Sequence, residues 1–191
     1  MSIDAVPAGP PSHEEYRALR ATIRERGTLR HLTTLITFSV WAATMLWATL
    51  SFGTPTFVVV PLLVLVAGFE IGFSLHVGVE RIGRYLQVRY ERESGTLVCW
   101  ETTAMALHVP SGGVDPLFSR IYFAAAAVNF WLGSWAAGAS QNPIDDPALV
   151  GELAVCGLLH IVAALRWLRA VRFARNQRVA ELAAFEQLLK K

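Results

Sequence analysis

Two histidines, His76 and His160, lie inside long apolar stretches of this chain. Each belongs to a row of small or polar residues spaced about one helical turn apart, so each row falls on one helix face. The rows are Gly68, Gly72, His76, Glu80 and Arg84, and Glu152, Cys156, His160 and Ala164. The next arginine follows His76 by five residues and His160 by six. At a helical rise of 1.5 Å, both are expected about 8–9 Å below the cytoplasmic boundary, where they would approach each other.

Two neutral imidazoles from facing helices form the ligand set of a six-coordinate haem iron. One hypothesis is therefore an electron-transfer subunit that binds b-type haem or another tetrapyrrole, with His76 and His160 as the axial metal ligands. The residues expected to make room for the ring or to meet its propionates are Gly72, Gly157, Arg84 and Arg120.

Three further polar residues, Glu70, Glu80 and Asn129, are expected to be buried in the bilayer. Ionisable groups are costly in hydrocarbon and often mark proton or ion pathways, so a small proton or ion conductor is a second alternative. A purely structural interpretation is also open, in which Glu70 bonds Asn129 and His76 bonds Glu80. Four spans without a visible inverted repeat make a stand-alone transporter less attractive.

The positions of the charged residues predict a membrane protein. Of the 191 residues, 53% are hydrophobic and 17% are charged, against about 25% charged in soluble domains. No Asp, Glu, Lys or Arg lies between Arg30 and Glu70, or between Arg120 and Asp145. Because a spanning helix needs about 20 apolar residues, these stretches are long enough to cross a bilayer.

Four spans are predicted, and three of them begin with a capping residue followed by proline, at Thr54-Pro55, Asp115-Pro116 and Asp146-Pro147. The spans cover residues 31–52, 56–79, 116–139 and 147–167. Short outer turns make neighbouring helices antiparallel. The predicted fold is an all-α integral membrane four-helix bundle in up-down-up-down order, with cytoplasmic helical extensions of the second and fourth spans.

Outside the spans, the chain is predicted to be helical and cytoplasmic. Residues 1–30 form an N-terminal segment with a short amphipathic helix that begins near Ser12, and residues 168–191 form a C-terminal helix. Residues 80–115, within the transmembrane domain 31–167, form a cytoplasmic or interfacial helical connection. All 17 basic residues fall on this side. The positive-inside rule then predicts a multi-pass protein with both termini in the cytoplasm, typical of a bacterial inner membrane.

Enzyme chemistry is the less favoured interpretation. The sequence holds no metal-ligand cluster, GxSxG elbow, P-loop or GxGxxG. A net charge of +2 without basic runs next to stacking aromatics gives no nucleic-acid signal. Trp41, Trp47, Trp131 and Trp135 are expected to face lipid or the interface. The elaborate inner surface favours a non-enzymatic accessory or interaction subunit, within a homo-oligomer or a larger membrane complex.

Overall fold

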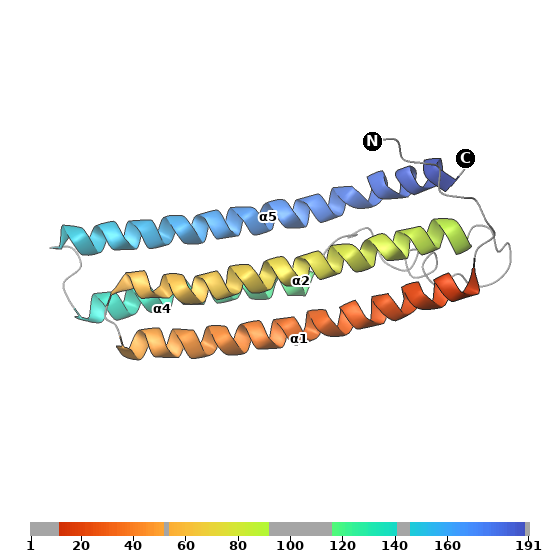
Figure 1. The fold of residues 1–191 in the computed structure, drawn as a ribbon. Coiled ribbons are helices and arrows are strands. Elements are labelled where there is room, and N and C mark those ends of the chain that lie inside the picture. Colours follow the sequence, from red (N-terminus) through yellow and green to blue (C-terminus); the bar gives the residue numbers. More distant parts are fainter. Residues whose placement is uncertain (1–11, 52–53, 92–115, 141–145, 190–191) are drawn as a thin grey trace, which may run out of the picture. The chain divides into compact units, whose positions relative to one another are not determined.

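The computed structural model describes residues 12–51, 54–91, 116–140 and 146–189. These residues form helices and no strand, and Figure 1 labels the four long helices α1, α2, α4 and α5. Three helices are long and apolar enough to cross a membrane, namely His13–Leu50, Pro55–Tyr90 and Pro147–Leu189. The predicted all-α class is confirmed for this part of the chain, and the length and composition of three of its helices are compatible with a membrane protein.

Helix α1 covers His13–Ser51. The Ser12 hydroxyl accepts hydrogen bonds from the backbone N–H groups of Glu14 and Glu15, at 3.2 and 3.5 Å, and so caps the helix. The helix continues unbroken into the apolar stretch, whereas the sequence suggested a separate short amphipathic helix. The physical reason is that this segment contains no proline, and its one glycine, Gly27, is tolerated within a helix.

The other elements begin close to where the sequence placed them. A short 3₁₀ turn, η1 (Pro55–Val58), leads into α2 (Val59–Leu86), which is followed by a π turn, η2 (Gln87–Glu91). Helix α4 covers Pro116–Ser140, and α5 covers Pro147–Leu189 as one helix of 43 residues. The Asp146 carboxylate caps α5 by accepting from the Ala148 backbone N–H at 2.9 Å. The predicted cap at residue 115 and the interfacial helix before it lie outside the described residues.

The chain divides into two compact units, and the division follows the distribution of charge. Unit 1 consists of residues 1–30, 74–114 and 172–191, and unit 2 consists of residues 31–73 and 115–171. Of the 17 basic residues, only Arg120, Arg166 and Arg169 belong to unit 2. Unit 2 therefore contains most of the predicted membrane-spanning residues. It ends in α2 at Phe73, earlier than the predicted end of the second span at Val79.

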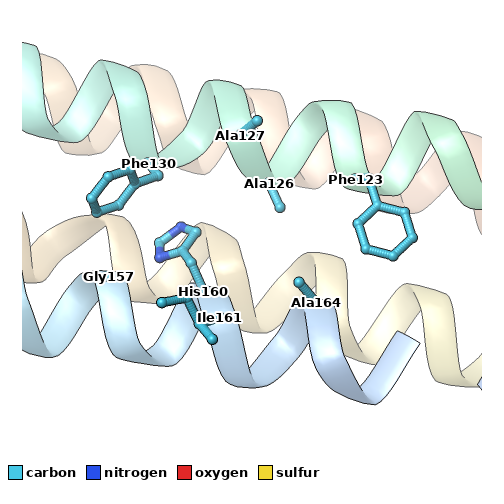
Figure 2. Close-up of a pocket in the computed structure, with 8 residues that line it drawn as sticks. All are labelled: Phe123, Ala126, Ala127, Phe130, Gly157, His160, Ile161 and Ala164. Atoms are coloured by element: carbon cyan, nitrogen blue, oxygen red, sulfur yellow. The ribbon is translucent and has the colours of Figure 1, made fainter. Parts of the chain in front are cut away.

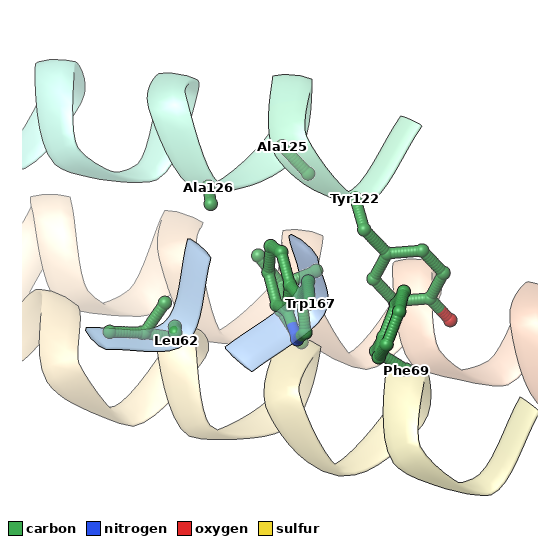
Figure 3. Close-up of a cluster of buried hydrophobic side chains, with 8 residues drawn as sticks. Leu62, Phe69, Tyr122, Ala125, Ala126 and Trp167 are labelled. Atoms are coloured by element: carbon green, nitrogen blue, oxygen red, sulfur yellow. The ribbon is translucent and has the colours of Figure 1, made fainter. Parts of the chain in front are cut away.

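The core of unit 2 is built by α2, α4 and α5. Its buried side chains, most of them labelled in Figure 3, are Leu62, Leu65, Phe69, Tyr122, Ala125, Ala126, Ala163 and Trp167. The two glycines of the GxxxG motif in α2 serve close packing. A Cβ atom at Gly68 would collide with the Thr37 side chain of α1, and one at Gly72 would lie 3.0 Å from the Phe118 ring of α4. Small residues here let neighbouring helices approach closely.

Contacts within unit 2 give the relative directions of its helices. Helices α4 and α5 are antiparallel, as shown by the contacts Phe123–Trp167, Asn129–His160 and Phe130–Gly157. The segment from η1 through α2 runs parallel to α5, as shown by Thr56–Glu152 and Glu70–Arg166. Helix α4 runs parallel to α1, as shown by Phe38–Tyr122 and Trp41–Asn129.

Candidate functional site

Asn129 of α4 is the centre of a buried hydrogen-bond network in unit 2. Its side chain is fully buried. The Asn129 Oδ1 atom accepts a hydrogen bond from the Trp41 indole N–H of α1 at 3.1 Å. Its Nδ2 group donates to the Val58 carbonyl of η1 at 2.9 Å and lies 3.0 Å from Nε2 of His160 in α5. One amide therefore joins four segments of the chain.

The protonation state of His160 follows from its two partners. Its Nδ1 atom lies 2.7 Å from the Cys156 carbonyl oxygen, which can only accept, so Nδ1 carries the proton. Its Nε2 atom faces the Asn129 amide nitrogen, which can only donate, so Nε2 is the acceptor. The ring is therefore neutral, and both of its nitrogens are used. The thiol of Cys156 extends the network by donating to the Pro55 carbonyl at 3.3 Å.

An apolar groove of about 390 Å³ lies beside this network, between α4 and α5 (Figure 2). The residues that line it are Phe123, Ala126, Ala127, Phe130, Gly157, His160, Ile161 and Ala164. Four of these residues are alanine or glycine, and the Phe130 ring stands edge-on to the His160 ring at 5.2 Å. Because both His160 nitrogens are bonded elsewhere, the groove offers an apolar surface and no hydrogen-bonding group from this ring.

Glu70 forms an ion pair with Arg166 and does not bond Asn129. The Arg166 Nε and Nη2 atoms donate to the two carboxylate oxygens at 2.5 and 3.0 Å. The Glu70 and Arg166 side chains keep 35% and 62% of their surface exposed, so this pair lies at the surface of unit 2. It also places residue 70 of α2 beside residue 166 of α5. His76 follows Glu70 by six residues in α2, whereas His160 precedes Arg166 by six in α5.

The expected approach of the two histidines at equal depth stays a prediction, because His76 belongs to unit 1 and His160 to unit 2.

His76 belongs to unit 1, where its partner is an arginine. Its Nδ1 atom lies 3.1 Å from Nη1 of Arg30, and its side chain is buried. Since a guanidinium can only donate, Nδ1 accepts and the ring proton sits on Nε2. Neither His76 nor His160 then presents a lone pair to a metal ion. The haem hypothesis stays a prediction, and these hydrogen bonds argue against it because both would have to break first.

Glu80 and Arg84 take part in a structural network of unit 1. The Arg84 guanidinium is buried and donates to Glu80 at 3.2 Å and to Glu181 at 2.5 Å. Arg81 donates to the same Glu181 carboxylate at 3.0 Å. Arg84, a candidate for haem propionates, is therefore already paired with carboxylates. The Glu80 side chain is one-third exposed, so Asn129 is the only fully buried member of the three polar residues.

The role of Trp41 was missed by the sequence reasoning. Trp47, Trp131 and Trp135 are exposed on the isolated chain, as the expectation of lipid-facing tryptophans requires. Trp41 instead bonds Asn129. The sequence offered only the spacing, because Trp41 stands one turn after Thr37 in a row that continues at Met45 and Ala48. The structure shows that this row is buried at residues 37, 45 and 48.

No group of three or more His, Cys, Asp or Glu side chains that could hold a metal ion occurs among the described residues. The described geometry is therefore that of a helix-joining polar network beside an apolar groove. In comparisons with known proteins, no family model, curated protein or solved structure matches this chain.

Proposed function

We propose that this chain is a non-enzymatic subunit of a membrane assembly, with unit 2 embedded in the bilayer and unit 1 serving as a cytoplasmic docking part. The observation that carries the proposal is the length of the helices. Helices α1 and α5 have 39 and 43 residues. At 1.5 Å per residue they are about 58 and 64 Å long, roughly twice the 30 Å hydrocarbon thickness. About half of each helix therefore projects from the membrane.

The helix directions within unit 2 support an up-down-up-down bundle in the bilayer. In this topology α1 and α4 share one direction and α2 and α5 share the other, which agrees with the contacts Phe38–Tyr122 and Trp41–Asn129 and with Thr56–Glu152 and Glu70–Arg166. Unit 1 holds all but three of the basic residues, which supports its cytoplasmic placement. Both chain termini belong to unit 1 and would lie on the same side.

Unit 1 has the internal bonds of a folded docking part. The Glu15 carboxylate of α1 accepts hydrogen bonds from the hydroxyls of Tyr85 and Tyr90, at 2.8 and 2.7 Å. The Tyr85 ring stands edge-on to the ring of Phe185 in α5, at 5.7 Å. Together with the Arg84–Glu181 pair, these contacts join segments of α1, α2 and α5. A partner would meet a preformed helical surface, which lowers the ordering cost of association.

The topology can be tested by labelling single cysteines. Both variants start from a chain in which Cys99 and Cys156 are replaced by alanine. The first carries a single cysteine at Gln141, in the predicted outer turn. The second carries a single cysteine at Val179, which is 75% exposed in unit 1. A membrane-impermeant maleimide should label Gln141→Cys in intact cells and Val179→Cys only after permeabilisation. Labelling of Val179→Cys in intact cells would refute the cytoplasmic placement.

The docking role can be tested by photo-crosslinking in cells. A photoreactive residue at Val179 should give a discrete protein adduct, and the matched control is Leu158, which is 60% exposed on α5 within unit 2. Gentle purification should also yield a particle heavier than the 21.0 kDa chain plus its micelle. A solitary monomer without adducts, which conducts protons in vesicles, would contradict the proposal. A Soret band lost in both His76→Ala and His160→Ala would instead favour the haem hypothesis.

A further inference from the structure

We infer that the groove between α4 and α5 binds an anionic phospholipid, with an acyl chain along the groove and the phosphate on Arg120. The inference rests on the membrane placement of unit 2 and is independent of what unit 1 docks to. Groove and arginine both belong to unit 2.

The lining of the groove selects an apolar occupant. Seven of its eight lining residues are alanine, glycine, isoleucine or phenylalanine, and the eighth is His160. The nitrogens of His160 are bonded to Asn129 and to the Cys156 carbonyl. A polar headgroup inside the groove would therefore lose its hydration without gaining a partner, whereas a hydrocarbon chain loses nothing. A volume of about 390 Å³ is within the range of small-molecule sites.

Arg120 supplies a charge at one end of the groove. On α4 the lining residues Phe123, Ala127 and Phe130 come three, seven and ten residues after Arg120. This spacing places Arg120 on the same face of α4, one turn before Phe123. Its side chain is exposed, and it has no carboxylate partner among the described residues. It is also the one basic residue of α4. An arginine fork is well matched to a phosphate, and its positive charge favours a lipid with a net negative charge over a zwitterionic one.

The experiment is native mass spectrometry of the full chain released from micelles that contain phosphatidylglycerol or phosphatidylcholine with identical acyl chains. The wild type should retain one phosphatidylglycerol, about fivefold in preference to phosphatidylcholine, the ratio expected for one arginine near an anionic group. Arg120→Gln should lose the preference. Its matched control is Arg169→Gln, which removes an exposed arginine of α5 that does not continue the groove-lining positions and should keep the preference.

A larger side chain in the groove tests whether the groove holds the acyl chain of the lipid. Ala127→Leu places a larger side chain in the groove from an exposed position, so the fold should tolerate it and retention of both lipids should fall. Ala124→Leu is the matched control, because Ala124 is equally exposed on α4 and lies outside the groove. Equal retention of the two lipids by the wild type, equal losses in Arg120→Gln and Arg169→Gln, or unchanged retention in Ala127→Leu would each overturn the inference. An added mass of one further chain in place of lipid, lost in Ala127→Leu, would assign the groove to a second copy.

Discussion

Replacing Asn129 by alanine should destabilise unit 2 strongly, because the change removes three hydrogen bonds at once. The fully buried amide bonds the Trp41 indole, the Val58 carbonyl and the His160 ring. Hydrogen bonds between membrane helices average about 0.6 kcal/mol each, so three of them amount to about 2 kcal/mol. Part of this loss comes from partners left buried and unsatisfied, which no apolar side chain can replace.

The assay is the free energy of unfolding, measured by titrating the purified protein with SDS in mixed micelles. Ser134→Ala is the matched control, because the Ser134 hydroxyl bonds the Phe130 carbonyl of its own helix and no other described residue, so its loss should cost about 0.5 kcal/mol or less. A double-mutant cycle with Trp41→Phe isolates the bond between the indole and Asn129. If Asn129→Ala were no more destabilised than Ser134→Ala, the reasoning from the network would be refuted.

Two further predictions concern packing and pH. Gly68→Ala should lower the free energy of unfolding by about 1–3 kcal/mol in the same SDS titration, because the new Cβ atom meets the Thr37 side chain. Gly151 has open space around it, so the control Gly151→Ala should leave the free energy of unfolding equal or higher. Hydrogen bonds from Tyr90 and Tyr85 lower the pKa of the Glu15 carboxyl. The contribution of Glu15 to the stability of the fold is therefore present above its ordinary pKa of 4.5, and it is lost as the pH falls through the lowered pKa. The difference in melting temperature between wild type and Glu15→Gln should therefore vanish in acid, and a difference that persists there would contradict this assignment. Burial and the Glu15 carboxylate raise the pKa of Tyr90 to about 12. The contribution of Tyr90 to stability is therefore present below its ordinary pKa of 10.0, and it is lost as the pH rises through about 12.

Much of the fold could be predicted from local features of the sequence. Proline marks the starts of η1 and α5, and Asp146 caps α5 as predicted, whereas the predicted cap Thr54 makes no side-chain cap hydrogen bond. The charge-free stretch between Arg30 and Glu70 marks parts of two helices that are long and apolar enough to cross a membrane. These signals act within one helical turn or along one helix, so they can be detected without knowing any neighbour. The continuation of α1 through residue 30 is also local, because nothing in that segment breaks a helix.

The register between helices could not be predicted in the same way. Depth was measured along each helix from its nearest arginine, and this assumes that every arginine marks the same membrane boundary. Arg166 shows that an arginine can be held by a partner on a neighbouring helix, because its side chain bonds Glu70 of α2. Which carboxylate an arginine reaches depends on how far one helix slides against the other, and no feature within a single helix determines that.

The buried polar groups of unit 2 have a physical role that the small residues alone cannot fill. Faces of glycine and alanine allow two helices to approach at several registers, because a shift by one turn brings similar side chains together. A directional group removes that freedom. A shift by one turn would move Asn129 about 5 Å away from the Val58 carbonyl and the His160 ring, and would leave all of them unsatisfied. We therefore attribute the single arrangement of α1, α4, α5 and η1 to this network, and the closeness of the packing to the glycines.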